Sequence, residues 1–256
     1  MKILVCVKQV YVPGTDVTID HSSGWIQYNP TGFRLNSYDE YALEEALLIK
    51  ERIADTRVHA VSIGPGRTEV AIRRAMEIGA DEGIQIRYEK EGYLSPYQTA
   101  SLISSYAKEK QYDLIMTGVT AEDDMQMQTG QMIAGTLNYP YASSVIKLEM
   151  KTEHLVYVER ECDAMRRECV ELPMPCVLTI QSGINKPRYP ALSNVLRTKQ
   201  QKLMEIPAQD LVMPEAREKI IKVFLPETTA RGVFLQGSAK EKAVELLRIL
   251  HEKAFL

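Results

Sequence analysis

The segment from Gly118 to Gln131 carries the residues best suited to holding a charged ligand. Its last part, Gln128-Thr129-Gly130-Gln131, stands where we expect a helix to begin. The first N–H groups of a helix have no partner within it and the helix dipole is positive there, so this position can receive an anion such as phosphate. Alternatively, Thr129 only caps its helix and Asp123-Asp124 lies in a solvated turn. Spacing alone leaves both interpretations open.

Two further segments end predicted strands with groups that a ligand could approach. Cys6-Val7-Lys8-Gln9 ends the first strand, and Ile63-Gly64-Pro65-Gly66 ends the second. In open parallel sheets, ligands bind beyond the carboxyl ends of the strands, near the switch in strand order. Neither GxGxxG nor GxxxxGK[ST] occurs, so the two common nucleotide motifs are absent.

The sequence gives little support to catalysis by side chains. The four histidines lie in unrelated segments, without a serine or cysteine elbow motif: His21, His59, His154 and His251. We interpret His59, inside a predicted strand, as a core residue. Asp123 and Asp124 are neighbours in sequence, so unless the backbone turns sharply we expect their side chains to diverge and to form a poor acid/base pair.

The composition is that of an ordinary globular protein. The 256 residues suffice for one sizeable core with an appendage. Lys and Arg number 31 against 34 Asp and Glu, which leaves no electrostatic footprint for nucleic acid or an acidic membrane. No apolar stretch approaches the roughly 18 residues of a membrane span, and the opening apolar run is too short for a signal peptide. The four cysteines form no CxxC pair and are expected to be buried or half-buried free thiols, which suits a reducing compartment.

Alternating strands and helices fill the first half of the chain. A strand over Met1–Val10 is followed by a long loop over 11–34, with a small hairpin around Ile26. A helix then follows, and Asn36 or Ser37 can cap its first turn, with Glu40 nearby. Further strands are expected at 58–63, 83–86 and 113–118. Helices are expected through Ile78, with Thr68 as its cap, from Ser95-Pro96, and from Gln128 to Leu137. This order predicts right-handed crossovers and a Rossmann-like, doubly wound α/β domain, with a mainly parallel sheet and helices on both faces.

The pattern changes after residue 143. Strands at 145–149 and 155–160 are expected to pair around Thr152-Glu153, and another strand follows at 176–180. Four prolines between residues 187 and 214 then prevent a continuous core element. An amphipathic helix is expected over Ser238–Leu256.

Taken together and in order, these segments resemble the beta subunits of electron transfer flavoproteins over nearly the whole chain. The matching segments are Leu4–Val10, Leu35-Asn36, Glu44-Glu45-Ala46, Ala60–Pro65, Met76–Asp81, Asp123-Asp124, Gln128–Met132, Val158-Glu159-Arg160, Leu172-Pro173 and Asn185–Pro190. Two positions depart from the family pattern. Asp163-Ala164-Met165 replaces a common Asp-Gly-Gly turn, and Met127 stands where an Asn is common.

The resemblance implies a heterodimeric electron carrier. An alpha subunit would hold most of the FAD, and this subunit would bury a structural AMP without bond-making catalysis of its own. Flavin dehydrogenases such as acyl-CoA dehydrogenase would donate the electrons, and a downstream acceptor would receive them. Carried over by position, the cofactor-binding residues are Cys6, Asn36, Ile63, Gly64, Gly118, Asp123, Asp124, Met127, Gln128 and Thr129.

The resemblance also divides the chain into a nucleotide-binding domain over residues 1–186 and a second part over 187–256. This second part would hold a partner-recognition loop and a C-terminal arm that contacts the alpha subunit. Within the loop, Leu192 takes the position of an exposed anchor, with Val195, Leu196 and Arg197 beside it. Alternatively, Leu192 is simply a core residue.

Two other functions are weighed against this one. A bifurcating-type beta subunit would bind a second FAD and use NADH, but it usually shows an Asp-Gly turn and a Val-Gly-Pro sequence in place of Asp123-Asp124 and Gln128-Thr129-Gly130. A stand-alone adenine-nucleotide-binding regulator or ligase-like enzyme would share the fold and leave residues 185–200 unexplained. The expected location is the cytoplasm, or the mitochondrial matrix if a transit peptide has been removed.

Overall fold

A computed structural model of the chain describes residues 1–12, 17–20, 25–27, 32–90, 92–225, 232–253 and 255. Its main strands are β1 (Lys2–Cys6), β6 (Arg57–Gly64), β7 (Glu82–Arg87), β8 (Leu114–Gly118), β9 (Tyr141–Thr152), β10 (Leu155–Glu161), β11 (Arg167–Pro173), β12 (Cys176–Ile180) and β13 (Met204–Pro207). Its helices are α1 (Ser37–Arg52), α2 (Glu69–Ile78), α3 (Pro96–Lys108), α4 (Thr129–Leu137), α5 (Leu192–Thr198) and α6 (Ala239–Glu252).

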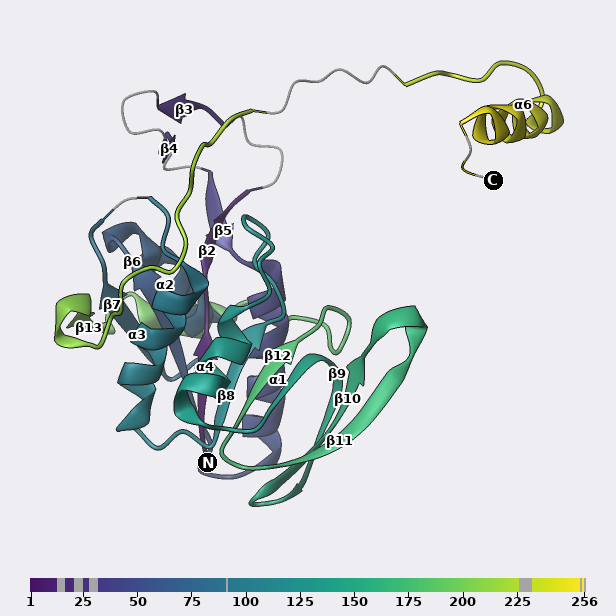
Figure 1. The fold of residues 1–256 in the computed structure, drawn as a ribbon. Coiled ribbons are helices and arrows are strands. Elements are labelled where there is room, and N and C mark those ends of the chain that lie inside the picture. The colour runs from purple at the N-terminus through teal and green to yellow at the C-terminus, as the bar shows by residue number, and fades with distance from the viewer. Residues whose placement is uncertain are drawn as a thin grey trace. The chain divides into compact units, whose positions relative to one another are not determined.

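The strands form one sheet in the order β11-β10-β9-β12-β8-β1-β6-β7-β13 (Figure 1). From β9 to β13 every neighbouring pair is parallel, whereas β10 runs antiparallel to both β9 and β11. The chain moves outward from β1 to β6 and β7, and then returns to place β8 on the other side of β1. The switch in strand order therefore lies between β1 and β8.

Helices cover both faces of the sheet. Ile3 and Val5 of β1 belong to a core that includes apolar residues of α1 and α2. Leu4, between them in sequence, belongs to a second core with apolar residues of α3 and α4. Successive side chains of a strand point to opposite faces, so a strand buried on both faces reads as a continuous apolar run. The predicted fold class, a mainly parallel α/β sheet with helices on both faces, is confirmed.

The predicted helix starts lie at the right positions, but two of the caps are wrong. Ser95 accepts a hydrogen bond from the Gln98 N–H at 3.2 Å and so caps α3, as a Ser-Pro start should. Asn36 and Thr68 precede α1 and α2 without a side-chain cap bond. Asn36 instead bonds the loop after β8, and the Thr68 hydroxyl donates to the Pro65 carbonyl at 3.0 Å. Both side chains serve the strand ends rather than their own helices.

The predicted first strand is two strands in different sheets. β1 ends at Cys6, and the chain then bends into β2 (Gln9–Tyr11), which pairs with β5 (Phe33–Leu35). The expected hairpin around Ile26 is present as β3 (Ile19–Asp20) paired with β4 (Trp25–Ile26). The rest of the predicted loop, at 13–16, 21–24 and 28–31, lies outside the described residues.

The antiparallel end of the sheet is longer than expected. β9 and β10 pair across Thr152-Glu153 as predicted, but the sequence analysis missed β11, which forms the edge of the sheet. Cys169 lies on β11 and is exposed, so the expectation of buried or half-buried thiols is wrong for this residue. β11 is the last strand of the sheet, so no further strand packs beside it and its outward side chains are exposed to solvent.

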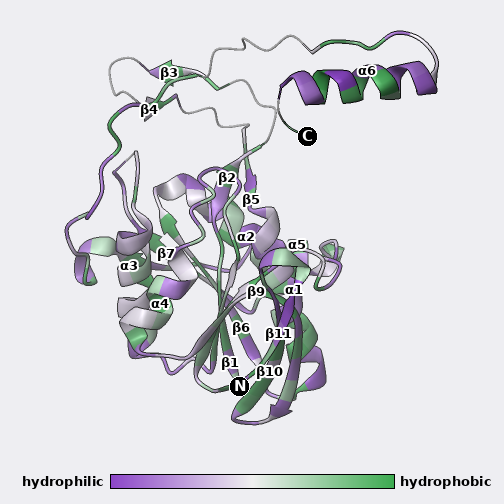
Figure 2. Cartoon of the chain, turned by 45° about the vertical axis from the view of Figure 1, so that its right-hand side comes forward, coloured by the Kyte–Doolittle hydropathy of each residue, from purple (hydrophilic) through white to green (hydrophobic). Residues whose placement is uncertain are grey.

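The described residues form two compact units, Met1–Val223 and Phe224–Leu256. The first includes α5 and β13, which the sequence analysis did not predict. The second contains α6, where Ser238 and Glu241 form a capping box. Polar and apolar residues alternate along α6 (Figure 2), and Leu246 and Leu247 are about half exposed. The division at residue 187 stays a prediction.

The turn between β10 and β11 is held in an unfavourable backbone conformation. Ala164 and Met165 have φ values of 59° and 57°, in the left-handed region that favours glycine. These two residues replace the two glycines of the family pattern. A side chain in this region costs about 1 kcal/mol or more.

We therefore expect the double substitution Ala164→Gly, Met165→Gly to stabilise the chain by about 1 kcal/mol and to raise its melting temperature by about 2–4 °C. Calorimetry measures this shift. Arg166→Gly is the matched control, because Arg166 follows in the same turn with a φ of −80° and should lose stability on substitution. A lower melting temperature in the double variant would contradict the assignment of strain.

Candidate functional site

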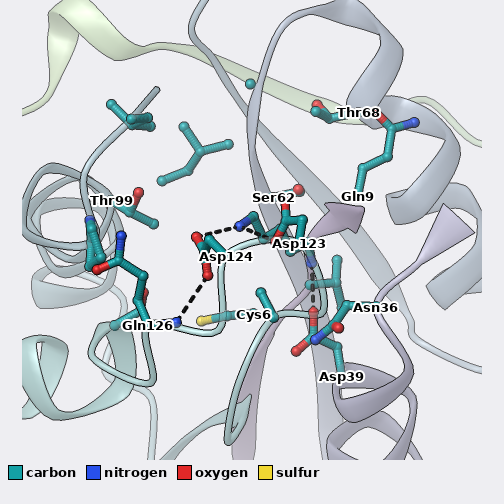
Figure 3. A pocket seen from close by; sticks show the side chains of 18 of the residues that line it. Cys6, Gln9, Asn36, Asp39, Ser62, Thr68, Thr99, Asp123, Asp124 and Gln126 are labelled. Carbon is teal, nitrogen blue, oxygen red and sulfur yellow. Dashed lines mark hydrogen bonds and ion pairs between the residues drawn. The ribbon is translucent and has the colours of Figure 1, made fainter. Parts of the chain in front are cut away.

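A pocket of about 320 Å³ opens at the carboxyl ends of β1, β6 and β8. All ten residues that the resemblance assigned to cofactor binding line it: Cys6, Asn36, Ile63, Gly64, Gly118, Asp123, Asp124, Met127, Gln128 and Thr129. Figure 3 shows the side chains of five residues that line the pocket: Cys6, Asn36, Asp39, Asp123 and Asp124. Four segments far apart in sequence meet here because β1 lies beside both β6 and β8. The pocket therefore sits at the switch in strand order, where open α/β sheets bind ligands.

Asp39, in the first turn of α1, ties the ends of β1 and β8 together. Its carboxylate accepts the Lys8 N–H at 2.7 Å and the Gly118 N–H at 3.0 Å. A Cβ at Gly118 would lie 2.5 Å from Asp39 Oδ1, so only glycine allows this approach. Burial raises the pKa of Asp39 to about 7, although both backbone hydrogen bonds act in the opposite direction. The sequence analysis missed this residue, since an acidic residue in a first helical turn usually only complements the dipole.

Asn36 fixes the loop that follows β8. Its Nδ2 donates to the Thr120 carbonyl at 2.9 Å, and its Oδ1 accepts the Glu122 N–H at 3.2 Å. Glu122 in turn accepts the Ser37 hydroxyl at 2.8 Å and pairs with Arg34 at 2.8 Å. Asn36 is itself buried, so these bonds hold the loop against the start of α1.

The two aspartates of this loop converge, which contradicts the expectation that they diverge. The Lys8 ammonium lies 2.7 Å from Asp123 Oδ1 and 2.8 Å from Asp124 Oδ2. Burial alone would lower the pKa of Lys8, but the two carboxylates outweigh it and raise the pKa. Both aspartates lie in a turn over residues 122–124, where the Met125 N–H donates to the Ala121 carbonyl at 2.9 Å, and the sequence pattern did not reveal this turn.

The pocket ends at the start of α4, as predicted. Gln128 precedes the helix without a side-chain cap bond, and Thr129 is the first helical residue, so the alternative that Thr129 merely caps its helix is wrong. Gly130 lets the helix approach the sheet closely, because a Cβ there would lie 2.3 Å from Thr179 Cγ2. The first N–H groups of α4 are therefore available to an anion in the pocket.

Thr120 is the clearest sign of a polar ligand. Its side chain is 9% exposed and lines the pocket. Within the described part of the chain, Thr120 Oγ1 has no hydrogen-bond partner. A buried hydroxyl without a partner costs about 1–3 kcal/mol, so such groups in native proteins usually meet a ligand or water.

Aromatic residues form the outer wall of the pocket, which the sequence analysis did not predict. Trp25, the only tryptophan of the chain, lies 6.4 Å from Tyr93 between ring centroids. Phe33 packs under the Arg67 guanidinium, 4.6 Å from its ring centroid, and Arg67 donates to Gln9 at 2.6 Å. All five residues line the pocket. They come from β2, β4, β5, the turn after β6 and the segment before α3, which are far apart in sequence, so no spacing rule brings them together.

The side chains that could do other chemistry are accounted for. Burial raises the pKa of the Cys6 thiol, with the charge of Asp39 adding to the effect, so Cys6 stays protonated. His59 is buried, as predicted, and its Nδ1 lies 3.0 Å from the Tyr112 hydroxyl. Among the described residues, no group of three or more His, Cys, Asp or Glu could hold a metal ion. A search of the same residues finds no helix both long and apolar enough to cross a membrane.

The predicted partner-docking residues lie on α5, away from the pocket. Leu192 is 74% exposed and Leu196 is 57% exposed, whereas Val195 is partly buried and Arg197 is exposed. The interpretation of Leu192 as a core residue is therefore wrong. α5 packs beside α2, where Arg73 donates to the Thr198 carbonyl at 2.8 Å.

The segment before α5 is anchored to α1. Asn185 donates to Glu45 at 2.9 Å, and Arg188 Nε donates to Glu44 at 2.8 Å. Hydrogen bonds to Glu44 and Glu51 raise the pKa of Arg188. Two sequence motifs that looked unrelated, Glu44-Glu45 and the Asn185–Pro190 segment, thus contact each other and fix where the docking residues lie.

Asp39 should make the stability of the chain depend on pH. Its pKa rises from an ordinary 3.8 to about 7 on folding, so between these values the folded chain holds a proton that the unfolded chain has lost. The Asp39 contribution to the free energy of unfolding should fall as pH rises from about 4 to about 7, by up to about 1.4 kcal/mol per pH unit, and stay constant above.

Urea unfolding of the native chain and of Asp39→Asn across this range measures the contribution as a difference. The difference should change with pH, on top of a constant loss in the variant, because an asparagine amide would face a backbone N–H. Asp210→Asn, an exposed position, is the control and should track the native chain. A difference for Asp39→Asn that is the same at every pH would contradict the prediction.

Comparisons with known proteins agree on one family. The family model described as electron transfer flavoprotein domain matches residues 27–211. A protein of Bradyrhizobium diazoefficiens is 34% identical over 241 residues, covering 94% of this chain and 95% of the relative. Relatives from Dictyostelium discoideum (32% over 249 residues, 97% of each chain) and Bacillus subtilis (31% over 260 residues, 99% of each chain) are similar over almost their whole length. All three are named electron transfer flavoprotein subunit beta. With the family model matching well over half of the chain, this protein belongs to the electron transfer flavoprotein family, among its beta subunits.

Proposed function

We propose that the chain is one subunit of a heterodimeric electron transfer flavoprotein, with AMP in its pocket and FAD held mainly by an alpha subunit. It would carry electrons between flavin dehydrogenases and a downstream acceptor, without bond-making catalysis of its own. One observation carries the proposal: all ten residues assigned to the nucleotide line a single pocket at the switch in strand order.

The residues present fit an adenine mononucleotide. The start of α4 offers N–H groups for the phosphate, and Thr129 and Gln128 lie beside them. The hydroxyl of Thr120 would gain the partner that it lacks among the described residues. The ends of β1 and β6, at Cys6 and Ile63-Gly64, offer backbone groups and apolar surface for the base. AMP supplies no redox chemistry, and its effect when bound is to stabilise the native state.

Three side chains of the pocket that could do chemistry, those of Lys8, Asp39 and Cys6, are held by partners or by burial. Lys8 is held between Asp123 and Asp124. Both oxygens of Asp39 accept backbone N–H groups, and the Cys6 thiol is kept protonated by burial. A nucleophile or general base needs a lone pair free to reach substrate, so these groups support a structural role.

The nucleotide site is tested by its ligand content. The chain would be purified with its alpha subunit and denatured, and the released nucleotides identified and counted. One AMP and one FAD per heterodimer would support the proposal. Two FAD and no AMP would favour the bifurcating type instead, and no adenine nucleotide besides one FAD would contradict the AMP site.

Thr129→Glu should abolish AMP binding, because a carboxylate at the start of α4 repels the phosphate and competes for its N–H groups. Bound ligand stabilises by mass action, by about 2.7 kcal/mol at a hundredfold excess over Kd, so AMP should raise the melting temperature of the native chain but not of this variant. Thr136→Glu places the same charge at an exposed position of the same helix and should keep the shift. An unchanged AMP content in Thr129→Glu would exclude the site.

The exposed face of α5 supports a docking role. Leu192 and Leu196 form a small apolar surface beside the exposed Arg197, which suits transient binding of a flavin dehydrogenase. Contacts at both ends, with α1 and with α2, hold this surface in place. The C-terminal part of the chain would contact the alpha subunit, and the half-exposed apolar residues of α6 support this.

Leu192→Ala should weaken dehydrogenase docking by about thirtyfold, since losing a well-packed anchor costs about 2 kcal/mol. Rates of electron transfer from the dehydrogenase measure the loss at limiting concentrations of the carrier. Because Leu192 is 74% exposed, the melting temperature and flavin spectrum should not change. Val212→Ala, at an equally exposed valine elsewhere, should leave transfer intact. A native transfer rate in Leu192→Ala would remove Leu192 from the docking site.

The expected location, the cytoplasm or the mitochondrial matrix, stays a prediction. The four cysteines are free thiols, and Cys6 and Cys176 are buried. Such thiols persist in a reducing compartment. Free thiols therefore support a reducing compartment, and they are equally compatible with the cytoplasm and the mitochondrial matrix.

A further inference from the structure

An extended segment at residues 211–218, here termed the strap, runs along α3 towards the mouth of the pocket. The Val212 N–H donates to Ser105 at 3.1 Å, and Gln98 donates to the Pro214 carbonyl at 3.2 Å. Further along, the Arg217 guanidinium lies over the Tyr97 ring, 4.4 Å from its centroid. These contacts advance from the C-terminal half of α3 to its first turn. The strap therefore reaches the end of α3 that borders the pocket.

At that end the strap joins the pocket wall through Tyr93. The Tyr93 hydroxyl donates to Glu218 at 2.9 Å and accepts from Gln126 Nε2 at 2.6 Å. The Gln126 N–H in turn donates to Asp124 at 3.2 Å, and Asp124 binds the Lys8 ammonium. A continuous set of hydrogen bonds thus leads from the strap to the loop that ends at α4.

Tyr93 and Gln126 line the pocket, whereas Glu218 does not. The Tyr93 ring also lies near the Trp25 ring of β4, 6.4 Å between centroids. Burial, followed by the hydrogen bond to Glu218, raises the pKa of Tyr93 to about 12, so its hydroxyl keeps its proton and can donate to Glu218 while accepting from Gln126. Glu218 precedes the second compact unit, which begins at Phe224.

We propose that Tyr93 is a positioning residue that couples occupancy of the pocket to the strap. A nucleotide in the pocket holds Gln126 and Tyr93 in their places, which strengthens the bond from Tyr93 to Glu218. The strap is then ordered up to Glu218, within the part of the chain (187–256) whose C-terminal arm is proposed to contact the alpha subunit. The inference rests on the proposed nucleotide site and adds to it a route by which the ligand affects the C-terminal part.

Thermodynamic linkage gives this coupling a quantitative form. If the nucleotide orders the strap, then fixing the strap must raise nucleotide affinity by the same factor. A single charge-assisted hydrogen bond at a partly exposed position supports a factor of about 3–10. Glu218 is outside the pocket, so a change in affinity on its removal cannot arise from lost contact with the ligand.

The experiment uses the full chain with AMP as the probe. Emission of Trp25, the only tryptophan, reports binding, and hydrogen–deuterium exchange of residues 211–218 reports order in the strap. In the native chain AMP should slow this exchange. Tyr93→Phe and Glu218→Ala should each lose the slowing and weaken AMP binding about 3–10-fold, and the double variant should be no worse than either single one.

Two matched variants serve as controls. Tyr97→Phe removes a neighbouring hydroxyl but keeps the ring that carries Arg217, and Glu215→Ala removes another carboxylate of the strap. Both should behave as the native chain. Equal melting temperatures without ligand would separate coupling from a loss of fold.

Each outcome decides the inference. The coupling would be overturned if Tyr93→Phe and Glu218→Ala bound AMP with native affinity although exchange of the strap was no longer slowed. It would also be overturned if the loss of AMP affinity in the double variant equalled the sum of the two single losses. In both cases the nucleotide site would stand. If AMP fails to change either Trp25 emission or the melting temperature of the native chain, the nucleotide site falls and the coupling falls with it. Slowed exchange that survives in Tyr93→Phe would assign the coupling to another contact and overturn the role of Tyr93.

Discussion

The arrangement of the site depends on one carboxylate between two strand ends. β1 and β8 are neighbours at the switch in strand order, and their last N–H groups have no further strand to bond. Asp39 accepts both, from Lys8 and from Gly118. A buried carboxylate is costly to ionise, which is why burial dominates its pKa, and the two N–H groups offset part of this cost. The positions of Lys8 and of the loop after Gly118 follow from this contact.

The same helix also fixes the docking surface. Asp39 lies in the first turn of α1 and holds the pocket, while Glu44 and Glu45 lie further along and hold Arg188 and Asn185. α2 begins just after the turn that follows β6 and binds the end of α5 through Arg73. The candidate pocket and the proposed docking surface are therefore both held by α1 and α2. The proposed carrier role, without bond-making catalysis, would require only that a cofactor environment and a partner surface are held in fixed relation.

Strands and helices of the parallel sheet could be predicted because each is specified by local patterns. Buried strands are short apolar runs, and Ser95-Pro96 and Gly79 mark helix ends by their own backbone preferences. The ten pocket residues were found by resemblance, and the topology explains why they meet. The pairing of Lys8 with two aspartates and the role of Asp39 were not predicted, because both depend on partners about 30 to 115 residues away. The expected divergence of Asp123 and Asp124 was wrong, since both lie in a turn over residues 122–124 that no glycine or proline marks in the sequence.

In loop 118–128, the cost of the strained backbone is similar in size to the stabilisation from its ion pairs. Met125 and Met127 have φ values of 51° and 56°, and each costs about 1 kcal/mol or more relative to glycine. The opposing contribution is the pairing of Lys8 with two aspartates, and ion pairs at a half-exposed lysine contribute about 0–1 kcal/mol each. The two sets of terms are similar in size, so the loop has little stability to spare from these contacts alone. Asn36 supplies two further hydrogen bonds, but at the other end of the loop. The end next to α4 is therefore the part that would gain most from a phosphate at the start of the helix, which gives the proposed structural nucleotide a physical reason.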